Sequence, residues 1–490
     1  MRMDRRLFLG GLLTGLATRG RADAPLTSVR PVARPATAAR AAVPAGGAAD
    51  LVAEAKLGGR TCYALFDLKS GEMIEAIDPG RPMPPASTAK AITSLYALEH
   101  LGAGYRFATR VIATGPVQGG KVAGDLVLAG GGDPTLTTDG LAELAAALAK
   151  QGVRGVEGRF RVWGGALPYI REIDRDQPEW VGYNPAVGGL NLNFNRVNFT
   201  WKRQGKDYAV GMNAEDRRFV PQVNVARVSL SERDLPVYAY DEKGGFEDWS
   251  VSRQALGGGG SRWLPVRHPD LYAGDVFRTL AAGAGLKLPA PEVASRAPQG
   301  RVLAERGSDD LDDILRQMMR YSTNMTAETV GMAASQRRGV TRHAVSGPEM
   351  SAWLGGRAGV EGARFVDHSG LGGASRISAE AMASALVRLG PGARLATLMK
   401  EIGVEEDGVR LPATVHAKTG TLNFVSALTG YFTAPGGRQM VFAIFSADVD
   451  RRDALGMSER ERPKGGKAWV KRARGLQHDL IGRWASLYSA

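Results

Sequence analysis

Ser87 and Lys90 are the two residues whose types and spacing most directly suggest chemistry in this chain. The Pro-rich stretch 81–85 ends extended structure and helix-compatible residues follow it, so we predict a helix from Ser87 to a stop at Gly102. Residues at i and i+3 share one face of a helix, which places the Ser87 hydroxyl beside the Lys90 amine. A serine hydroxyl needs a base to become a nucleophile, and a lysine is such a base only when its pKa falls toward neutrality. The pair therefore predicts nucleophilic catalysis, although alone such a tetrad is more often a solvated helix face.

Two motifs further along the chain supply the other groups that such chemistry needs. Ser322-Thr323-Asn324 is the only Ser-x-Asn of the sequence, and Lys418 opens its only Lys-Thr-Gly. The Ser322 hydroxyl can both donate and accept, so it can relay a proton toward a leaving amine. Asn324 can position Lys90 or a substrate amide. We expect the charge of Lys418 to depress the pKa of Lys90, so that Lys90 is the neutral base and Lys418 the anchor for an anionic substrate.

The residues after Lys418 are predicted to form the strand edge along which a substrate lies. The hydroxyls of Thr419 and Thr421 suit a terminal carboxylate, and Gly420 has no side chain to obstruct the substrate. The backbone N–H groups of Ser87 and Thr421 are the predicted oxyanion hole. Together the three motifs predict acyl transfer through a serine.

With these motifs in view, the sequence resembles the class C low-molecular-mass penicillin-binding proteins, which are serine D-Ala-D-Ala carboxypeptidase/endopeptidases. The resemblance runs from about Ala49 to the C-terminus. It rests on Pro85-Ala86-Ser87-Thr88-Ala89-Lys90, Gly124-Asp125-Leu126 with Gly130-Gly131-Gly132-Asp133-Pro134, Ser322-Thr323-Asn324 with Ala327-Glu328, Ser369-Gly370-Leu371, and Lys418-Thr419-Gly420-Thr421.

The resemblance implies an α/β (α+β) fold, in which a β-lactamase/transpeptidase-like catalytic domain carries a nested insertion of two smaller, strand-rich domains. It also implies a periplasmic hydrolase that trims or cleaves peptidoglycan stem peptides through a Ser87 acyl-enzyme and is acylated by β-lactams such as penicillin. Two features depart from the family pattern. Gly372-Gly373 replace a Ser-Arg pair, with Arg376 three residues on, and no acidic residue follows Trp180. These departures leave the preferred side chain of the stem peptide open.

Residues 1–24 read as an export signal. Arg5-Arg6 precede a short apolar run that is too short to span a bilayer, a pattern similar to twin-arginine signals. Residues 25–48 are rich in Ala and Pro without apolar periodicity, which is typical of a flexible linker. We therefore expect an exported, periplasmic protein whose folded part begins near Ala49.

The spacing of the motifs indicates an inserted region. Lys90 and Ser322 are 232 positions apart, which is far more than a loop of a compact domain contains. We predict that the catalytic domain comprises residues 49–104 and 271–490. Residues 105–270 are predicted to form two inserted domains, one nested in the other.

The periodicity of apolar residues predicts the strands and the C-terminal helix of the catalytic domain. We expect a hairpin within 60–77 and two strands at 423–433 and 439–447. Near the C-terminus, apolar residues recur at helical period from Trp469 through Trp484 to Leu487. This stripe favours a helix packed on the sheet, and the alternative is an amphipathic membrane anchor.

The formal net charge is +13, of which about +10 remains after residues 1–24, because these carry five Arg and two Asp. No nucleic-acid recognition motif accompanies that charge, so a weak peripheral contact with the cell wall or a membrane suits it better. The six His residues lack ligand spacing and Cys62 is the sole cysteine, so we expect no metal, no cofactor and no intrachain disulfide.

Two other readings stay open on the sequence. The first is a β-lactamase or an esterase on the same fold, which would need a group that activates water for fast deacylation. The second, from another class, is a non-catalytic protein that binds the cell wall or senses penicillin. Binding alone does not require a serine at position 87, which argues against the second reading.

Overall fold

The computed structural model describes residues 47–488, apart from 404, 407–408 and 411–412. The predicted signal peptide lies outside the described residues, as does the predicted linker except for Gly47 and Ala48. The described chain begins with α1 (Ala48–Glu54), at the point where we expected folding to begin.

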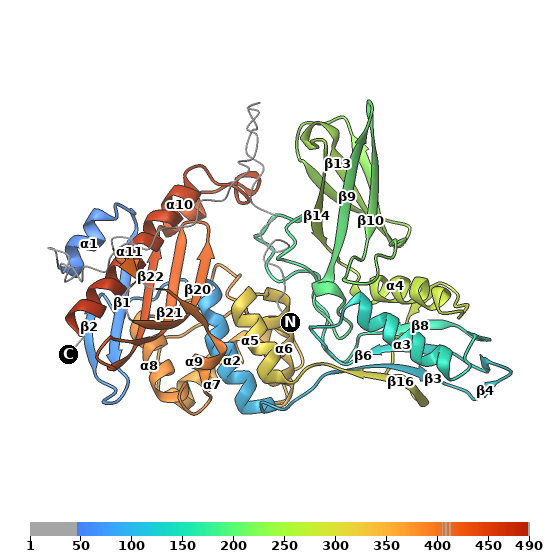
Figure 1. The fold of residues 1–490 in the computed structure, drawn as a ribbon, viewed down its shortest axis with the longest axis horizontal. Coiled ribbons are helices and arrows are strands. Elements are labelled where there is room, and N and C mark those ends of the chain that lie inside the picture. The colour runs from blue at the N-terminus through green and yellow to red at the C-terminus, as the bar shows by residue number, and fades with distance from the viewer. Residues whose placement is uncertain (1–46, 404, 407–408, 411–412, 489–490) are drawn as a thin grey trace, which may run out of the picture. The chain divides into compact units, whose positions relative to one another are not determined.

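Six strands of the described chain form one antiparallel sheet (Figure 1). In sheet order these are β17 (Lys400–Ile402), β20 (Thr414–Leu422), β21 (Val425–Thr433), β22 (Gln439–Ala447), β1 (Arg60–Asp67) and β2 (Met73–Ile77). The predicted hairpins β1–β2 and β21–β22 are confirmed. β1 also pairs with β22 along its whole length, so the N-terminal hairpin is joined to the C-terminal strands.

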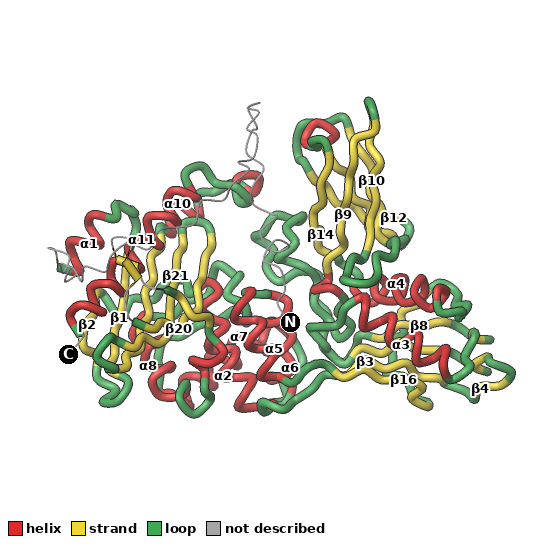
Figure 2. Tube along the Cα trace, viewed as in Figure 1, coloured by secondary structure: helices red, strands yellow, loops and turns green. Residues whose placement is uncertain are grey.

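A group of helices covers one face of this sheet and carries the Ser87 and Ser322 motifs, whereas the Lys418 motif lies on β20 (Figure 2). They are η1 (Ala86–Thr88), α2 (Ala89–Leu101), α5 (Leu311–Tyr321), α6 (Asn324–Gln336), α7 (His343–Ala358), α8 (Ala379–Leu389) and α9 (Leu395–Leu398). The predicted helix after Ser87 is confirmed, and it ends at Gly102 with φ +84°, a backbone conformation that favours glycine. α2 packs against α5, α6 and α7, and every residue from 89 to 97 is buried. The helix that bears Lys90 is therefore central.

The C-terminal helix α11 (Gly466–Leu487) packs on the opposite face of the sheet. Trp469 and Trp484 are fully buried, and their ring nitrogens donate to Leu57 O at 2.5 Å and Glu75 Oε1 at 3.0 Å. The apolar stripe is thus used for packing within the protein. Burying two tryptophans this way stabilises the fold, and only Leu487 at the end of the stripe is exposed.

The long insertion forms sheets of its own. The first has the order β15 (Pro291–Val293), β8 (Phe160–Trp163), β6 (Leu126–Gly130), β3 (Ala108–Ala113) and β16 (Arg301–Gly307), with α3 (Thr138–Lys150) and α4 (Pro269–Gly283) packed together on it. A small sheet of β4 (Val117–Gln118), β5 (Lys121–Val122) and β7 (Gly155–Val156) accompanies it.

Two further three-stranded sheets lie between β8 and β15 in the sequence, so one part of the insertion is nested in the other. They are β10 (Asp207–Asn213), β9 (Arg196–Gln204) and β14 (Gly259–Pro265), and β11 (Ala226–Ser231), β13 (Phe246–Ser252) and β12 (Tyr238–Lys243). In the described part of the chain, no strand of the insertion joins the catalytic sheet.

Residues beyond 270 also take part in the first inserted sheet. β15 pairs with β8, and β16 pairs with β3, although both lie after the boundary that we predicted at 270. Strand pairing joins residues that are distant in the sequence, so no change of composition shows that β15 and β16 belong to the inserted sheet. We propose that the inserted region extends from about 105 to about 307.

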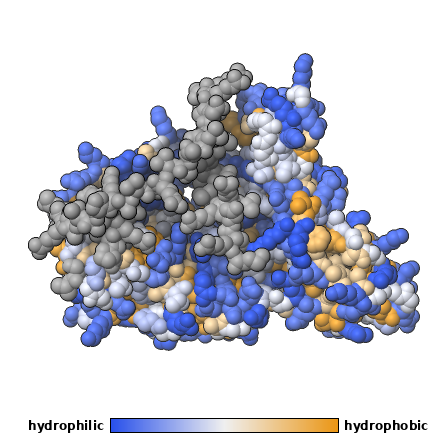
Figure 3. Space-filling model, viewed as in Figure 1, coloured by the Kyte–Doolittle hydropathy of each residue, from blue (hydrophilic) through white to orange (hydrophobic). Residues whose placement is uncertain are grey.

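The surface in view in Figure 3 is mostly hydrophilic, and hydrophobic residues appear on it in separate patches. Among the residues that the structure describes, no helix combines the length and the apolar character that crossing a bilayer requires.

Candidate active site

The Ser87 turn is held tightly between two other segments. Ala86, just before Ser87, adopts φ +47°, a left-handed conformation that is uncommon for a residue with a side chain. A Cβ on Gly420 would lie 3.0 Å from Ser87 N, and one on Gly370 would lie 1.8 Å from Ala86 O. Both glycines are therefore needed for the close approach of their segments. The resulting turn leaves Ser87 half-buried at the start of the helix.

Lys90 lies beneath Ser87 and has no exposed surface. Its Nζ is 3.0 Å from Ser87 Oγ, 2.8 Å from Asn324 Oδ1 and 2.7 Å from Ser369 O. The last two are carbonyl oxygens, which only accept hydrogen bonds. A neutral amine has two hydrogens and one lone pair. It can therefore donate to both carbonyls and present the lone pair to the Ser87 hydroxyl.

Burial lowers the pKa of Lys90 to about 7, while the charges of Asp367 and Glu328 act in the opposite direction. We expected burial and the charge of Lys418 to lower this pKa together, and desolvation by burial is the main cause. The predicted juxtaposition of Ser87 and Lys90 is present, and with this pKa a large fraction of the amine is neutral at physiological pH.

Lys418, on β20, is the second buried lysine. Its Nζ lies 2.9 Å from Ser322 Oγ and donates to Thr419 O at 2.7 Å. Burial, followed by the charge of Lys90, lowers the pKa of Lys418 well below its usual range. Among the described residues, neither lysine has a carboxylate within hydrogen-bond distance, so a bound anion is what would restore a full charge on Lys418.

The short link between α5 and α6 places Ser322 and Asn324 within hydrogen-bond distance of Lys418 and Lys90, respectively. Ser322 ends α5 with φ +59° and Asn324 begins α6, so one residue in extended conformation separates them. Ser322 therefore reaches Lys418 and Asn324 reaches Lys90. Ser87, Ser322 and Asn324 are all half-buried, so their polar groups are accessible to a ligand while the two amines lie underneath.

The edge of β20 supplies the predicted substrate-binding residues. Thr419 and Thr421 are exposed and alternate with the buried Gly420. Arg474, from α11, donates from Nη2 to Thr421 Oγ1 at 3.4 Å. No sequence motif marks Arg474 as a residue of the site, because only the packing of α11 on the sheet brings this cation to β20.

A pair of buried carboxyl groups, for which the sequence predicted no role, lies under the loop that holds Lys90. Glu328 accepts from Ser369 N at 2.8 Å, and Asp367 accepts from Gly370 N at 2.8 Å. Burial, and then the charge of Asp367, raises the pKa of Glu328 to about 8. Burial likewise raises the pKa of Asp367. The two carboxyls fix the loop whose carbonyl, Ser369 O, receives the Lys90 hydrogen bond.

The insertion reaches this site through the segment after Trp180. Asn324 Nδ2 donates to Tyr183 O at 3.0 Å, so the insertion contributes to the wall beside Lys90. The sequence has no acidic residue directly after Trp180, but the structure brings one from elsewhere. Glu461 accepts from Trp180 Nε1 at 2.5 Å and forms an ion pair with Arg262 at 2.8 Å.

Three comparisons relate the chain to known proteins. A model of the D-Ala-D-Ala carboxypeptidase 3 (S13) family matches residues 48–461. The chain is 27% identical over 429 residues to D-alanyl-D-alanine carboxypeptidase of Actinomadura sp. (strain R39), with 78% of this chain and 76% of that one covered. It is 25% identical over 425 residues to D-alanyl-D-alanine carboxypeptidase DacB of Haemophilus influenzae, with 81% and 87% covered.

The fold is similar to that of penicillin-binding protein 4 from Haemophilus influenzae, with a TM-score of 0.71, 21% sequence identity, and coverage of 89% of this chain and 99% of that one. The same protein in complex with a β-lactam gives a TM-score of 0.70. At this identity the likeness concerns the fold, and it confirms the predicted catalytic domain with its nested insertion.

Proposed function

The chain belongs to the D-Ala-D-Ala carboxypeptidase 3 (S13) family, and we propose that Ser87 is the nucleophile with which it hydrolyses the D-Ala-D-Ala end of peptidoglycan stem peptides. The observation that carries this proposal is the set of partners around Lys90 Nζ. Two of them are carbonyl oxygens and the third is the Ser87 hydroxyl, so the free lone pair of the neutral amine faces the proton that must leave.

In the first step, Ser87 Oγ attacks the carbonyl carbon of the penultimate D-Ala while Lys90 takes the hydroxyl proton. The negative charge that develops on the carbonyl oxygen is stabilised by the backbone N–H groups of Ser87 and Thr421. The C–N bond then breaks, and the departing amine of the terminal D-Ala must receive a proton. Ser322 lies on Lys418 Nζ and is suited to relay that proton. Water then adds to the ester carbonyl, the bond to Ser87 Oγ breaks, the shortened peptide leaves with the water oxygen, and a proton of that water passes through Lys90 to Ser87.

The substrate carboxylate is proposed to bind at the β20 edge, between Lys418, Thr419 and Thr421, with Gly420 leaving room for the peptide. Arg474 adds a second cation at Thr421. A carboxylate there raises the lowered pKa of Lys418 and so restores its ammonium charge, while Lys90 acts in its neutral form. This division of roles is the one expected from the sequence.

Peptidoglycan lies outside the cytoplasmic membrane, so the proposal includes export to the periplasm, which the pattern of Arg5-Arg6 and the following apolar run supports. β-Lactams are proposed to acylate the same serine because they carry a reactive amide carbonyl and a carboxylate in one molecule. Cleavage of cross-links, the endopeptidase reaction, uses the same acyl-enzyme with a different leaving amine.

The test uses the purified chain without residues 1–24. It should release one D-Ala from each molecule of diacetyl-Lys-D-Ala-D-Ala, and penicillin should add one adduct to its intact mass. Ser87→Ala should lose both signals, whereas Ser70→Ala, at an exposed serine of the β1–β2 turn, should keep both. An adduct that survives in Ser87→Ala contradicts the assignment. An adduct that disappears within seconds favours the β-lactamase reading instead.

A further inference from the structure

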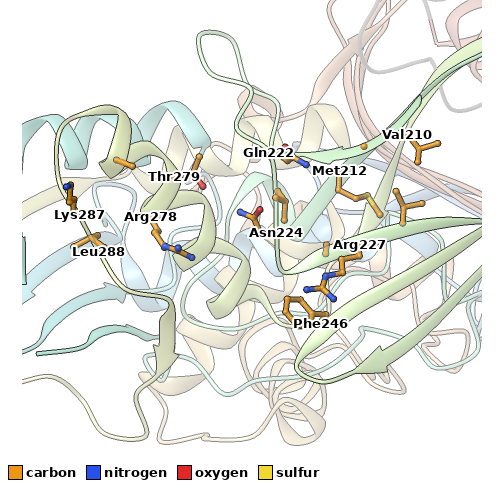
Figure 4. Close-up of a pocket in the computed structure, with 15 residues that line it drawn as sticks. Val210, Met212, Gln222, Asn224, Arg227, Phe246, Arg278, Thr279, Lys287 and Leu288 are labelled. Atoms are coloured by element: carbon orange, nitrogen blue, oxygen red, sulfur yellow. The ribbon is translucent and has the colours of Figure 1, made fainter. Parts of the chain in front are cut away.

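A groove of about 1000 Å³ lies within the insertion, where β10, β11 and α4 meet (Figure 4). A volume of this size is enough for a ligand of several sugar or amino-acid units. Its lining contains none of the residues proposed for catalysis. Figure 4 shows Arg278 and Lys287 on the α4 side of the groove and Arg227 with Phe246 on the strand side.

The charge of the groove is entirely of one sign. Arg227, Arg278 and Lys287 are exposed, and among the lining residues there is no Asp or Glu. None of the three forms an ion pair with any residue that the structure describes. Other arginines of the insertion are paired, for example Arg161 with Asp125 at 2.7 Å and Arg218 with Asp139 at 3.1 Å.

Two acids near the groove do not neutralise it. Asp275 of α4 is buried, and its carboxylate accepts from Asn224 N at 2.6 Å and from Val225 N at 3.4 Å, so it is occupied with backbone groups. Asp248 of β13 is in register with Arg227, but it does not line the groove, and no ion pair joins the two described side chains.

The Arg227 guanidinium is held flat. It stacks on the Phe246 ring at 3.3 Å from the ring centroid, a cation–π contact that restricts its rotation. A planar guanidinium fixed in this way presents two parallel N–H donors, the geometry that matches a carboxylate. The apolar side chains of Val210 and Met212 also line the groove.

We propose that this groove is a second binding site, which holds carboxylate groups of peptidoglycan stem peptides while Ser87 acts on another part of the polymer. The inference rests on the proposed function, because that function identifies the polymer to which this enzyme must be held. Three unpaired cations with one fixed guanidinium suit an extended ligand that carries several carboxylates. The site would raise the local concentration of substrate without taking part in the reaction.

The test measures binding of the penicillin-acylated protein to purified, teichoic-acid-free peptidoglycan, so that the catalytic cleft is occupied. The groove variant combines Arg227→Gln, Arg278→Gln and Lys287→Gln. The matched control combines Lys121→Gln, Lys202→Gln and Lys206→Gln, three exposed lysines of the insertion outside the groove. We expect the groove variant to bind about tenfold more weakly and the control to change by less than twofold. Equal losses in the two variants would overturn the proposal, because the effect would then be one of net charge.

Two further arms identify the chemistry. Methylamidation of the peptidoglycan carboxyls should remove the difference between wild type and groove variant. Tighter binding of the wild type to phosphatidylglycerol vesicles than to peptidoglycan would show that phosphate, and not carboxylate, is the ligand. Release of D-Ala from the small diacetyl tripeptide should be unchanged in the groove variant, while release from intact peptidoglycan should fall severalfold. Absence of tripeptide cleavage in the wild type would refute the proposed function, whereas unchanged peptidoglycan binding by the groove variant would refute the groove.

Discussion

Asn324 Oδ1 lies 2.8 Å from Lys90 Nζ, although 234 positions separate the two residues in the chain. The amide accepts a hydrogen bond from the amine without placing a charge beside it. The amide therefore leaves the desolvation-lowered pKa of Lys90 unopposed at this position, where a carboxylate would favour the ammonium form.

Replacing Asn324 with Asp should therefore disable the base without changing the size of the side chain. We expect the pH at which acylation is half-maximal to rise by at least one unit, because the new carboxylate raises the pKa of Lys90. Penicillin acylation rates measured between pH 6 and pH 10 test this. Asn324→Leu is the control, which should slow acylation without moving the midpoint upward. A midpoint that moves down in Asn324→Asp would contradict the role given to Lys90.

The wild-type pH profile follows from the lowered pKa of Lys90, about 7. The group must be neutral to act, so acylation should fall about tenfold for each pH unit below 7 and level off above it. The measurement is kcat/KM for a neutral thioester, whose binding does not depend on Lys418. A rate that continues to rise up to pH 10 would mean that Lys90 keeps its ordinary pKa in the free enzyme.

Substitutions of the two lysines should have different effects on a charged and on a neutral substrate. Lys90→Ala should lose about a thousandfold in kcat/KM toward both a D-Ala-D-Ala peptide and a neutral thioester, because the base is gone. Lys418→Gln should lose mainly the peptide, because it removes the partner of the carboxylate. If Lys418→Gln loses both substrates equally while Lys90→Ala stays active, the two roles are reversed.

Arg474 should act on binding and not on the chemical step. Arg474→Gln removes the cation that contacts Thr421, so KM for a peptide with a free carboxylate should rise about three- to tenfold while kcat changes little. Lys471→Gln, at an exposed neighbouring position of α11, is the control for charge. A fall in kcat alone would place Arg474 outside substrate binding.

Gly420 should tolerate no side chain. In Gly420→Ala the new Cβ would lie 2.8 Å from Pro85 O and 3.0 Å from Ser87 N, so the Ser87 turn would have to move. We expect acylation to slow at least tenfold and the free energy of unfolding to fall by about 1–3 kcal/mol. Gly283→Ala, where no atom lies within 4 Å of the new Cβ, should leave acylation unchanged and should not lower the free energy of unfolding.

The local part of this site could be predicted from the sequence. The separation of Ser87 and Lys90 is one helical turn, and alternating or helical periodicity marked the β1–β2 hairpin and α11. Such features depend on neighbours in the chain, so residue types and spacing determine them. The three motifs likewise indicated which groups would meet, because their chemistry is complementary.

Only the tertiary structure decided the electrostatics and the outer contacts of the site. The hydrogen bond from Lys90 to Ser369 O, the buried carboxyls of Glu328 and Asp367, and the approach of Arg474 to Thr421 all join segments that are distant in sequence. The same holds for β15 and β16, which return to the inserted sheet after residue 270. Burial of Lys90 comes from α5, α6, α7 and the loop around Ser369 packing around α2 together. A desolvation penalty depends on all the atoms that exclude water from a group, so no single motif contains it.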